Sequence, residues 1–296
     1  MTSDPNLRRW DGKKKGHYEV WYVTFNVEDR GYWIRTTLRA PHDGPPEGAL
    51  WFLEFVPGHA PRAWKEPIDP PGSMQLRGKA GEASWDIRLG SEGPKNFRLV
   101  PAALRPFVGT KTVAPHLDAR VSGTLRIGDK EIRFENARGS QTHLWGKGYG
   151  RGWAWAHANF DGGAFEGLGG RKPAIASLFA THEGRTWNLN TLFSVIKNRS
   201  ITRPEPTGWR FGGTSHNREI AGKITCNPLH MAGVTYHGTR GEKIYCYNTE
   251  IAQIALDLKT RQVFGAPWKV VAEIRGTAHY EIAGREPIEG IPILID

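Results

Sequence analysis

Residues 121–134 read VSGTLRIGDKEIRF and show the clearest alternation of apolar and polar residues in the chain. A period of two places alternate side chains on opposite faces of a strand. The residues that would share the apolar face are Val121, Leu125, Ile127, Ile132 and Phe134. Gly128-Asp129 interrupts the pattern, and a two-residue connection of this kind is a strong hairpin signal. The stretch therefore predicts an antiparallel β-hairpin.

Similar alternating stretches, bounded by turn residues, recur on both sides of this hairpin. In the first half they predict strands at 17–26, 32–40, 49–56, 82–89 and 95–100, with the proline-rich segment 57–72 as a loop. In the second half they predict strands at 153–160, 164–169, 174–181, 186–195, 209–212, 219–225, 232–237, 243–254 and 268–277. The only helix-length candidate is 102–107, which its prolines keep short.

The composition supports the same fold class. The 296 residues include 36 Gly, 20 Pro and 12 Trp, as expected for many turns between short aromatic strands. About eight strands in each half suit a closed or nearly closed barrel, which leaves no long exposed edge. We therefore expect an all-β protein with two antiparallel β-barrels or curved sheets in tandem. The glycine-rich passage 146–152 divides it into domains 1–148 and 149–296.

The charge and the cysteines narrow the class of protein. The net charge is +10, but apart from Lys13-Lys14-Lys15 and two nearby arginines the basic residues are scattered singly. This distribution argues against nucleic acid as a partner, while an anion-binding surface stays open as a weaker alternative. Two cysteines, Cys226 and Cys246, are too few for a disulfide scaffold, and would pair only if their strands do. Residues 1–16 are polar and no apolar run reaches membrane length, so we expect a cytoplasmic protein without integral membrane association.

The densest group of functional candidates lies at 141–160. On a strand over 153–160, four side chains share one aromatic and partly polar face, while alanines form most of the other face. The four are Trp153, Trp155, His157 and Asn159. Such a face suits a pocket wall with hydrogen-bonding groups, although each residue taken singly is equally well explained as ordinary core.

Two residues are candidate acids. His143 precedes the glycine-rich passage, where a side chain can point into a cavity mouth, although a lone histidine is more often structural. Glu54 interrupts an apolar run, so it lies either on a pocket wall or at a strand edge. On an apolar wall its carboxyl would have a raised pKa and would remain a proton donor near neutral pH.

Three further residues are candidates for substrate contact. Glu166 sits in the middle of a predicted strand and would point inward, and Tyr236 and Tyr247 belong to a second polar and aromatic group. We expect no metal and no cofactor. The 11 histidines lack zinc-site spacing, and a P-loop, a dinucleotide fingerprint and a nucleophile elbow are all absent.

The pattern His143-x-Trp145-Gly146, the Trp153-x-Trp155 strand and the Asp161-Gly162 turn together resemble the superfamily of hydroxyneurosporene synthase (carotenoid hydratase), the AttH-like proteins and the tocopherol-cyclase-like proteins. The resemblance is best over 85–170. It implies two lipocalin-like (calycin-type) domains with a hydrophobic ligand site. In the hydratase branch the His and Trp of this motif are implicated in activity, and they correspond to His143 and Trp145 here. The tyrosine and aspartate expected downstream of the motif have no clear match in this sequence.

The resemblance also implies a range of activities, because the superfamily includes terpenoid hydratases and cyclases, and its fungal members look like pericyclic cyclases of the Diels–Alderase type. Our hypothesis is a cofactor-independent hydratase or cyclase acting on a terpenoid- or polyketide-like molecule. His143 or Glu54 would supply the acid, and Trp145, Trp153 and Trp155 would hold the substrate. The alternative is a carrier that binds a lipid or isoprenoid without converting it.

Overall fold

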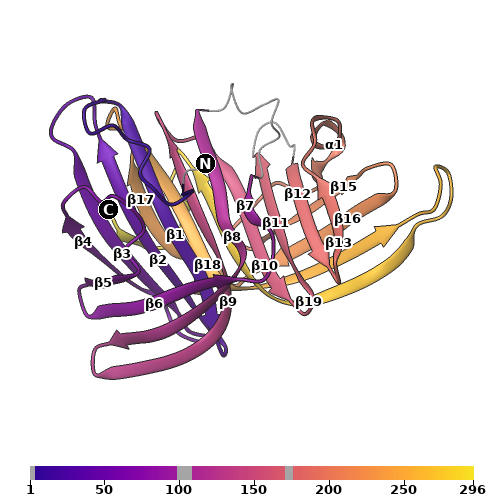
Figure 1. Ribbon diagram of the computed structural model, residues 1–296, viewed down its shortest axis with the longest axis horizontal. Helices are drawn as coiled ribbons and strands as arrows, with labels where there is room; N and C mark the ends of the chain where they lie inside the picture. The colour runs from indigo at the N-terminus through magenta and orange to yellow at the C-terminus, as the bar shows by residue number, and fades with distance from the viewer. Residues whose placement is uncertain (1–3, 99–108, 171–175) are drawn as a thin grey trace.

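The computed structural model describes residues 4–98, 109–170 and 176–296, and it confirms the all-β class with two large, curled antiparallel sheets (Figure 1). The strands of the first sheet are β1 (His17–Val27), β2 (Arg30–Ala40), β3 (Glu47–Phe55), β4 (Arg62–Ile68), β5 (Arg77–Ala80), β6 (Ala83–Ser91), β7 (Lys95–Phe97), β8 (Thr110–Ile127) and β9 (Lys130–Gly146). They lie in the order β4-β3-β2-β1-β9-β8-β6-β5, and β7 pairs with β8. The predicted hairpin joins β8 to β9.

The second sheet follows in the chain. Its strands are β10 (Trp153–Phe160), β11 (Gly163–Gly170), β12 (Ala176–His182), β13 (Arg185–Leu189), β14 (Arg199–Ser200), β15 (Gly208–Thr214), β16 (Arg218–Thr225), β17 (Ala232–His237), β18 (Lys243–Thr260), β19 (Lys269–Gly284) and β20 (Ile293–Ile295). The order is β13-β12-β11-β10-β19-β18-β16-β15-β14, with β17 between β18 and β20. Each sheet uses one half of the chain, so we retain domains 1–148 and 149–296 as a proposal.

Some predicted boundaries were wrong. The segment 57–72, expected as a loop, contains β4, which pairs with β3 alone in the described chain and so tolerates Pro67 at a sheet edge. The strand expected at 186–195 ends at Leu189, and a short helix, α1 (Leu192–Lys197), begins where the Thr191 side chain accepts a hydrogen bond from the backbone of Ser194. The helix candidate 102–107 lies outside the described residues.

Each sheet curls around an apolar core of its own. In the first, alternate residues of β1, Trp21, Val23 and Phe25, are buried inside the curl. In the second, Ala154, Ala156 and Ala158 of β10 face inward, as the alternation predicted. A third apolar cluster joins the sheets, with members from β2 and β3 on one side and from β17, β18 and β19 on the other. The opposite faces of β1 and β10 therefore meet in the space between the two sheets.

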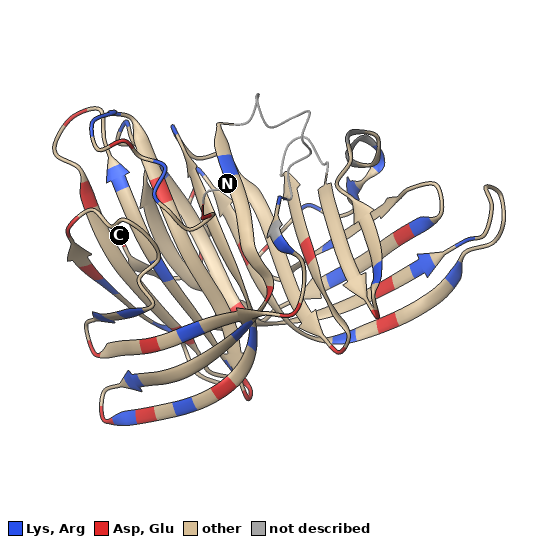
Figure 2. Ribbon diagram, viewed as in Figure 1, with Lys and Arg blue, Asp and Glu red and all other residues tan. Residues whose placement is uncertain are grey.

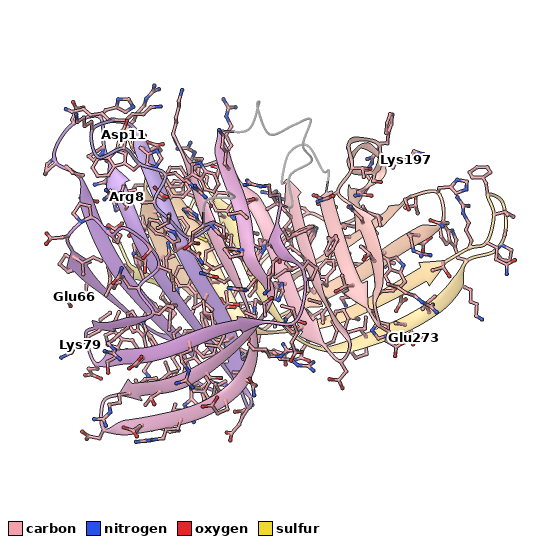
Figure 3. All side chains as sticks on the ribbon, viewed as in Figure 1. Arg8, Asp11, Glu66, Lys79, Lys197 and Glu273 are labelled. Atoms are coloured by element: carbon pink, nitrogen blue, oxygen red, sulfur yellow. The ribbon has the colours of Figure 1, made fainter. Side chains whose placement is uncertain are left out.

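Basic and acidic positions are interspersed along the strands and loops of both sheets (Figure 2). The labelled residues Arg8, Asp11, Glu66, Lys79, Lys197 and Glu273 lie at the periphery and are exposed (Figure 3). Among the described residues, no helix is both long and apolar enough to cross a membrane. Both cysteines are free thiols.

Candidate active site

A cavity of about 310 Å³ lies between the two sheets. Its walls come from β1, β2, β8 and β9 of the first sheet and from β10, β11, β17 and β19 of the second. The glycine-rich connection between the sheets completes the lining with Tyr149 and three glycines, Gly148, Gly150 and Gly152. A ligand in this space would contact both halves of the chain.

One group of polar side chains in the cavity centres on Arg35 and Glu281. The Arg35 guanidinium donates a 3.3 Å hydrogen bond to the Tyr149 hydroxyl and lies 3.9 Å from the centre of the Tyr236 ring. Trp153 donates its indole N–H to Glu281 Oε1. The cluster therefore presents a cation, a carboxyl group and two phenol hydroxyls to the same space.

Burial shifts the ionisation of this cluster. It raises the pKa of Glu281, although the Trp153 donor and the Arg35 charge oppose that shift. It also raises the pKa of the Tyr236 and Tyr149 hydroxyls. Burial alone would lower the pKa of Arg35, but the facing Tyr236, Tyr149 and Glu281 groups reverse this and raise it. Burial therefore shifts these oxygen groups toward their protonated forms, while the guanidinium of Arg35 keeps its charge.

A second group of side chains forms an aromatic wall with a carboxylate behind it. The Trp155 ring meets Tyr22 edge to face at 5.9 Å between centroids. Trp155 donates its indole N–H to Glu166 Oε1 over 2.7 Å, and Glu166 Oε2 lies 2.9 Å from His157 Nδ1. Both oxygens of Glu166 are thus engaged, so this residue serves to hold the wall in place.

A buried polar network continues from this wall into the contact between the sheets. The His157 ring stacks on His279 at 5.5 Å, and His279 Nε2 lies 2.8 Å from Asn26 Oδ1 of the first sheet. Burial lowers the pKa of His279, and the neighbouring His157 lowers it further. The same burial raises the pKa of Glu250, whose carboxylate lies 3.6 Å from His279 Nδ1. The network fixes the two sheets against each other beside the cavity.

The structure brings together only part of the predicted site. The candidates that line the cavity are Trp153, Trp155, Glu166 and Tyr236. His157 is fully buried behind Glu166, and Asn159 donates a 2.9 Å hydrogen bond to Asp118 of the first sheet. Trp145 packs against His143 and near Arg9 and Arg98, away from the cavity lining. Tyr247 lies in the core of the second sheet, where its hydroxyl accepts the backbone N–H of Ile288.

The expectation that His143 points into a cavity mouth was wrong. His143 is fully buried, and its neighbours on β9, Thr142 and Leu144, line the cavity instead. Its Nε2 lies 2.8 Å from Glu19 Oε1 and its Nδ1 lies 2.6 Å from the carbonyl oxygen of Pro5. Because successive side chains of a strand point to opposite faces, His143 faces the inside of the first sheet. There it helps to hold the N-terminal segment.

Glu54 also lies away from the cavity lining. Its buried carboxylate pairs with Arg62, at 2.9 Å from Nε, and with Arg30, at 3.3 Å from Nη1. Both carboxylate oxygens are engaged by arginines away from the cavity, so Glu54 is not placed for the proton-donor role expected from the sequence. The charge inside the apolar run of β3 is thus explained by an ion-pair cluster.

Sequence reasoning missed Arg35, Glu281 and three tyrosines of the cavity, Tyr18, Tyr22 and Tyr149. A signal was available for the first two. Arg35 directly follows Trp33-Ile34 on β2, and Glu281 lies between Tyr280 and Ile282 on β19, so each is a charge among bulky apolar or aromatic neighbours. The register then places Glu281 opposite Trp155. That pairing joins residues far apart in the chain and cannot be read from either strand.

Within the parts of the chain that the structure describes, no group of three or more potential metal ligands comes together. The side chains that line the cavity offer several functional groups. These are a guanidinium, a carboxyl group with a raised pKa, phenol hydroxyls and indole rings.

Comparison with known proteins supports the fold. No family model matches the sequence. Two uncharacterised proteins of Mycobacterium tuberculosis, Rv0493c of strain H37Rv and MT0513 of strain CDC 1551, are each 26% identical over 96% of this chain and 91% of their own length. Among solved structures, CghA with Sch210972 aligns with a TM-score of 0.53 at 9% identity, covering 91% of this chain and 88% of CghA. A second structure of CghA aligns with the same TM-score and covers 96% of this chain and 93% of CghA. The likeness shows a two-domain, lipocalin-like fold.

Proposed function

We propose that this protein is an enzyme that binds a small, largely apolar organic molecule between its two sheets and cyclises it without a cofactor. The observation that carries the proposal is the inter-sheet cavity, where the Glu281 carboxyl faces aromatic walls with its pKa raised by burial. A carboxyl group kept protonated in such a place can donate a hydrogen bond or a proton to substrate. The resemblance to the carotenoid hydratase superfamily, and the fold shared with CghA, which was solved with Sch210972, are compatible with this role.

The proposed role of Glu281 is to donate to a carbonyl oxygen of the substrate. As new carbon–carbon bonds form, a conjugated carbonyl gains negative charge on its oxygen, and a donor already in place stabilises that charge without reorganising. Trp153 holds Glu281 Oε1 and so fixes the carboxyl orientation. The aromatic wall of Trp155 and Tyr22 would press the apolar chain into a folded, reactive shape.

Arg35 favours cyclisation over the hydratase chemistry considered from the sequence. Hydration or cyclisation of a terpenoid by alkene protonation passes through a carbocation. The Arg35 guanidinium in the cavity wall would oppose such a cation electrostatically. The same charge assists a reaction in which negative charge develops. A carrier develops no charge on its ligand, so it places no requirement on Arg35. Only a measurement of turnover distinguishes the carrier from the enzyme.

The test uses a panel of linear polyene ketones with purified protein, followed by absorbance and mass spectrometry. Cyclisation removes conjugated double bonds at unchanged mass, whereas hydration adds the mass of one water. We expect Glu281→Gln to lower the rate roughly a hundredfold or more while ligand affinity is retained. Glu273→Gln, an exposed change on the same strand, is the matched control. Compounds that bind and are recovered unchanged from both proteins would establish the carrier instead.

A further inference from the structure

Arg35 is a buried cation placed between two cavities. Its exposed fraction is 3%, and it lines both the 310 Å³ cavity and a smaller one of about 60 Å³ on the β3 side. Aromatic rings surround it, with Tyr236 at 3.9 Å, Trp33 at 5.4 Å and Trp51 at 5.7 Å from the guanidinium carbon. These rings fix the plane of the guanidinium and exclude water from it.

The charge of Arg35 lacks a carboxylate partner within the described residues. Its Nη2 donates a hydrogen bond to the neutral hydroxyl of Tyr149, and its Nε is buried without an acceptor among the described residues. Other largely buried arginines are paired: Arg120, for example, contacts both Asp118 and Glu92. A buried guanidinium without a counter-charge is costly, so a structural role alone does not account for Arg35.

Among the described residues, the carboxyl groups near Arg35 do not form an ion pair with it. Glu281 Oε1 accepts the indole N–H of Trp153, and the two oxygens of Glu166 are engaged by Trp155 and His157. In the smaller cavity Glu47 is paired with Arg39 at 2.7 Å, and Lys65 Nζ lies 3.3 Å from the backbone oxygen of Asp296 and 4.5 Å from the centre of the Trp51 ring. The other charged groups of the smaller cavity therefore have partners of their own, while the wall of the larger cavity is mainly aromatic and apolar.

We propose that the ligand of the inter-sheet cavity is an amphipathic organic carboxylate. Its carboxylate accepts hydrogen bonds from Arg35 and Tyr149, and its apolar body lies against Trp153, Trp155 and Leu168. The geometry favours a single negative charge, because one guanidinium is left unpaired and its planar donors match a carboxylate. This inference rests on the proposed function for the location of the ligand, but not on the reaction.

The test compares two probes of nearly equal shape, biphenyl-4-carboxylate and the neutral biphenyl-4-carboxamide, by isothermal titration calorimetry. We expect the wild-type protein to bind the carboxylate at least roughly tenfold more tightly. Arg35→Met should abolish this preference and leave the carboxamide affinity nearly unchanged. Arg77→Met removes one exposed positive charge paired with Asp86, and should leave the preference intact.

The wild-type comparison stands even where Arg35→Met fails to fold. Equal affinity for the two probes in the wild type, or an undiminished preference in folded Arg35→Met, would overturn the assignment of charge. Leu168→Trp, which fills the cavity, separates the two proposals. If the wild type binds both probes equally and Leu168→Trp blocks both, only the carboxylate inference fails. If neither probe binds the wild type, or if Leu168→Trp leaves binding unchanged, the cavity is not the ligand site and both proposals fail.

Discussion

The carboxylate of Glu19 anchors the N-terminal segment to the first sheet, and this makes a measurable contribution to stability. The side chain is fully buried and accepts hydrogen bonds from the backbone N–H groups of Arg9, at 2.6 Å, and Trp10, at 3.1 Å. His143 and His17 contact the same carboxylate at 2.8 Å and 3.2 Å. Burial alone would raise the pKa of Glu19, but these donors outweigh it and lower the pKa to about 2.

The size of the effect follows from that shift. The unfolded carboxyl takes up a proton near its ordinary pKa of 4.5, whereas the folded one stays ionised down to about 2. The stabilisation is therefore complete above about pH 4.5 and is lost as the pH falls toward about 2. With about 1.4 kcal/mol per pKa unit, Glu19 accounts for a loss of about 2 kcal/mol between about pH 5 and about pH 3.

We would measure this loss by urea denaturation at about pH 5 and about pH 3. The two proteins compared are the wild type and the double variant Glu19→Gln/His143→Gln. Both residues are changed because Glu19→Gln alone would leave the buried His143 ring without its carboxylate partner. The variant is less stable throughout, and only the change with pH is compared. We expect the wild type to lose about 2 kcal/mol more than the variant on acidification. An equal loss in both proteins would refute an ionised Glu19 held by this network.

Three further outcomes follow from packing. Phe25→Ala should lower the free energy of unfolding by about 3–5 kcal/mol in urea denaturation, because the ring is fully buried in the first core. Gly163→Ala should cost about 2–4 kcal/mol in the same assay, because the carbonyl oxygen of Thr181 occupies the position of the new methyl group. Glu54→Gln should cost about 1–3 kcal/mol, because Arg30 and Arg62 lose their counter-charge, and calorimetric titration should show unchanged ligand affinity.

Local patterning predicted the elements well where one face of a strand differs from the other. The alanine face of β10 packs in the second core, and its tryptophans turn to the cavity, as period-two alternation requires. The hairpin between β8 and β9 carries the clearest pattern and forms where expected. The extent of the long strands was underestimated: β18 runs to Thr260, because its outer part stays paired with β19 after the apolar run ends. Pairing with a distant strand sustains structure that local composition does not indicate.

The site itself was predicted on one wall only, because its other residues depend on which strands pair. Arg35 and Glu281 enter the same cavity from strands nearly the whole chain apart. Strand β1 pairs with β9, and β10 pairs with β19, so in each sheet an early strand lies beside a late one. No pattern within either strand specifies these neighbours, which are set by closure of the curled sheets.

The architecture explains why the sequence did not show that His143 lies outside the cavity. Both faces of β9 are covered, one by the core of the first sheet and the other by the second sheet. A strand with one solvent face reveals its inward side through polarity, but a strand buried on both faces does not. On β9 one face carries the polar and aromatic side chains of His143 and Trp145, but the residues that line the cavity are Thr142 and Leu144 on the other face. The His-x-Trp pattern is therefore explained here by its contacts with the N-terminal segment, and the function is better sought on the faces that carry Arg35 and Glu281.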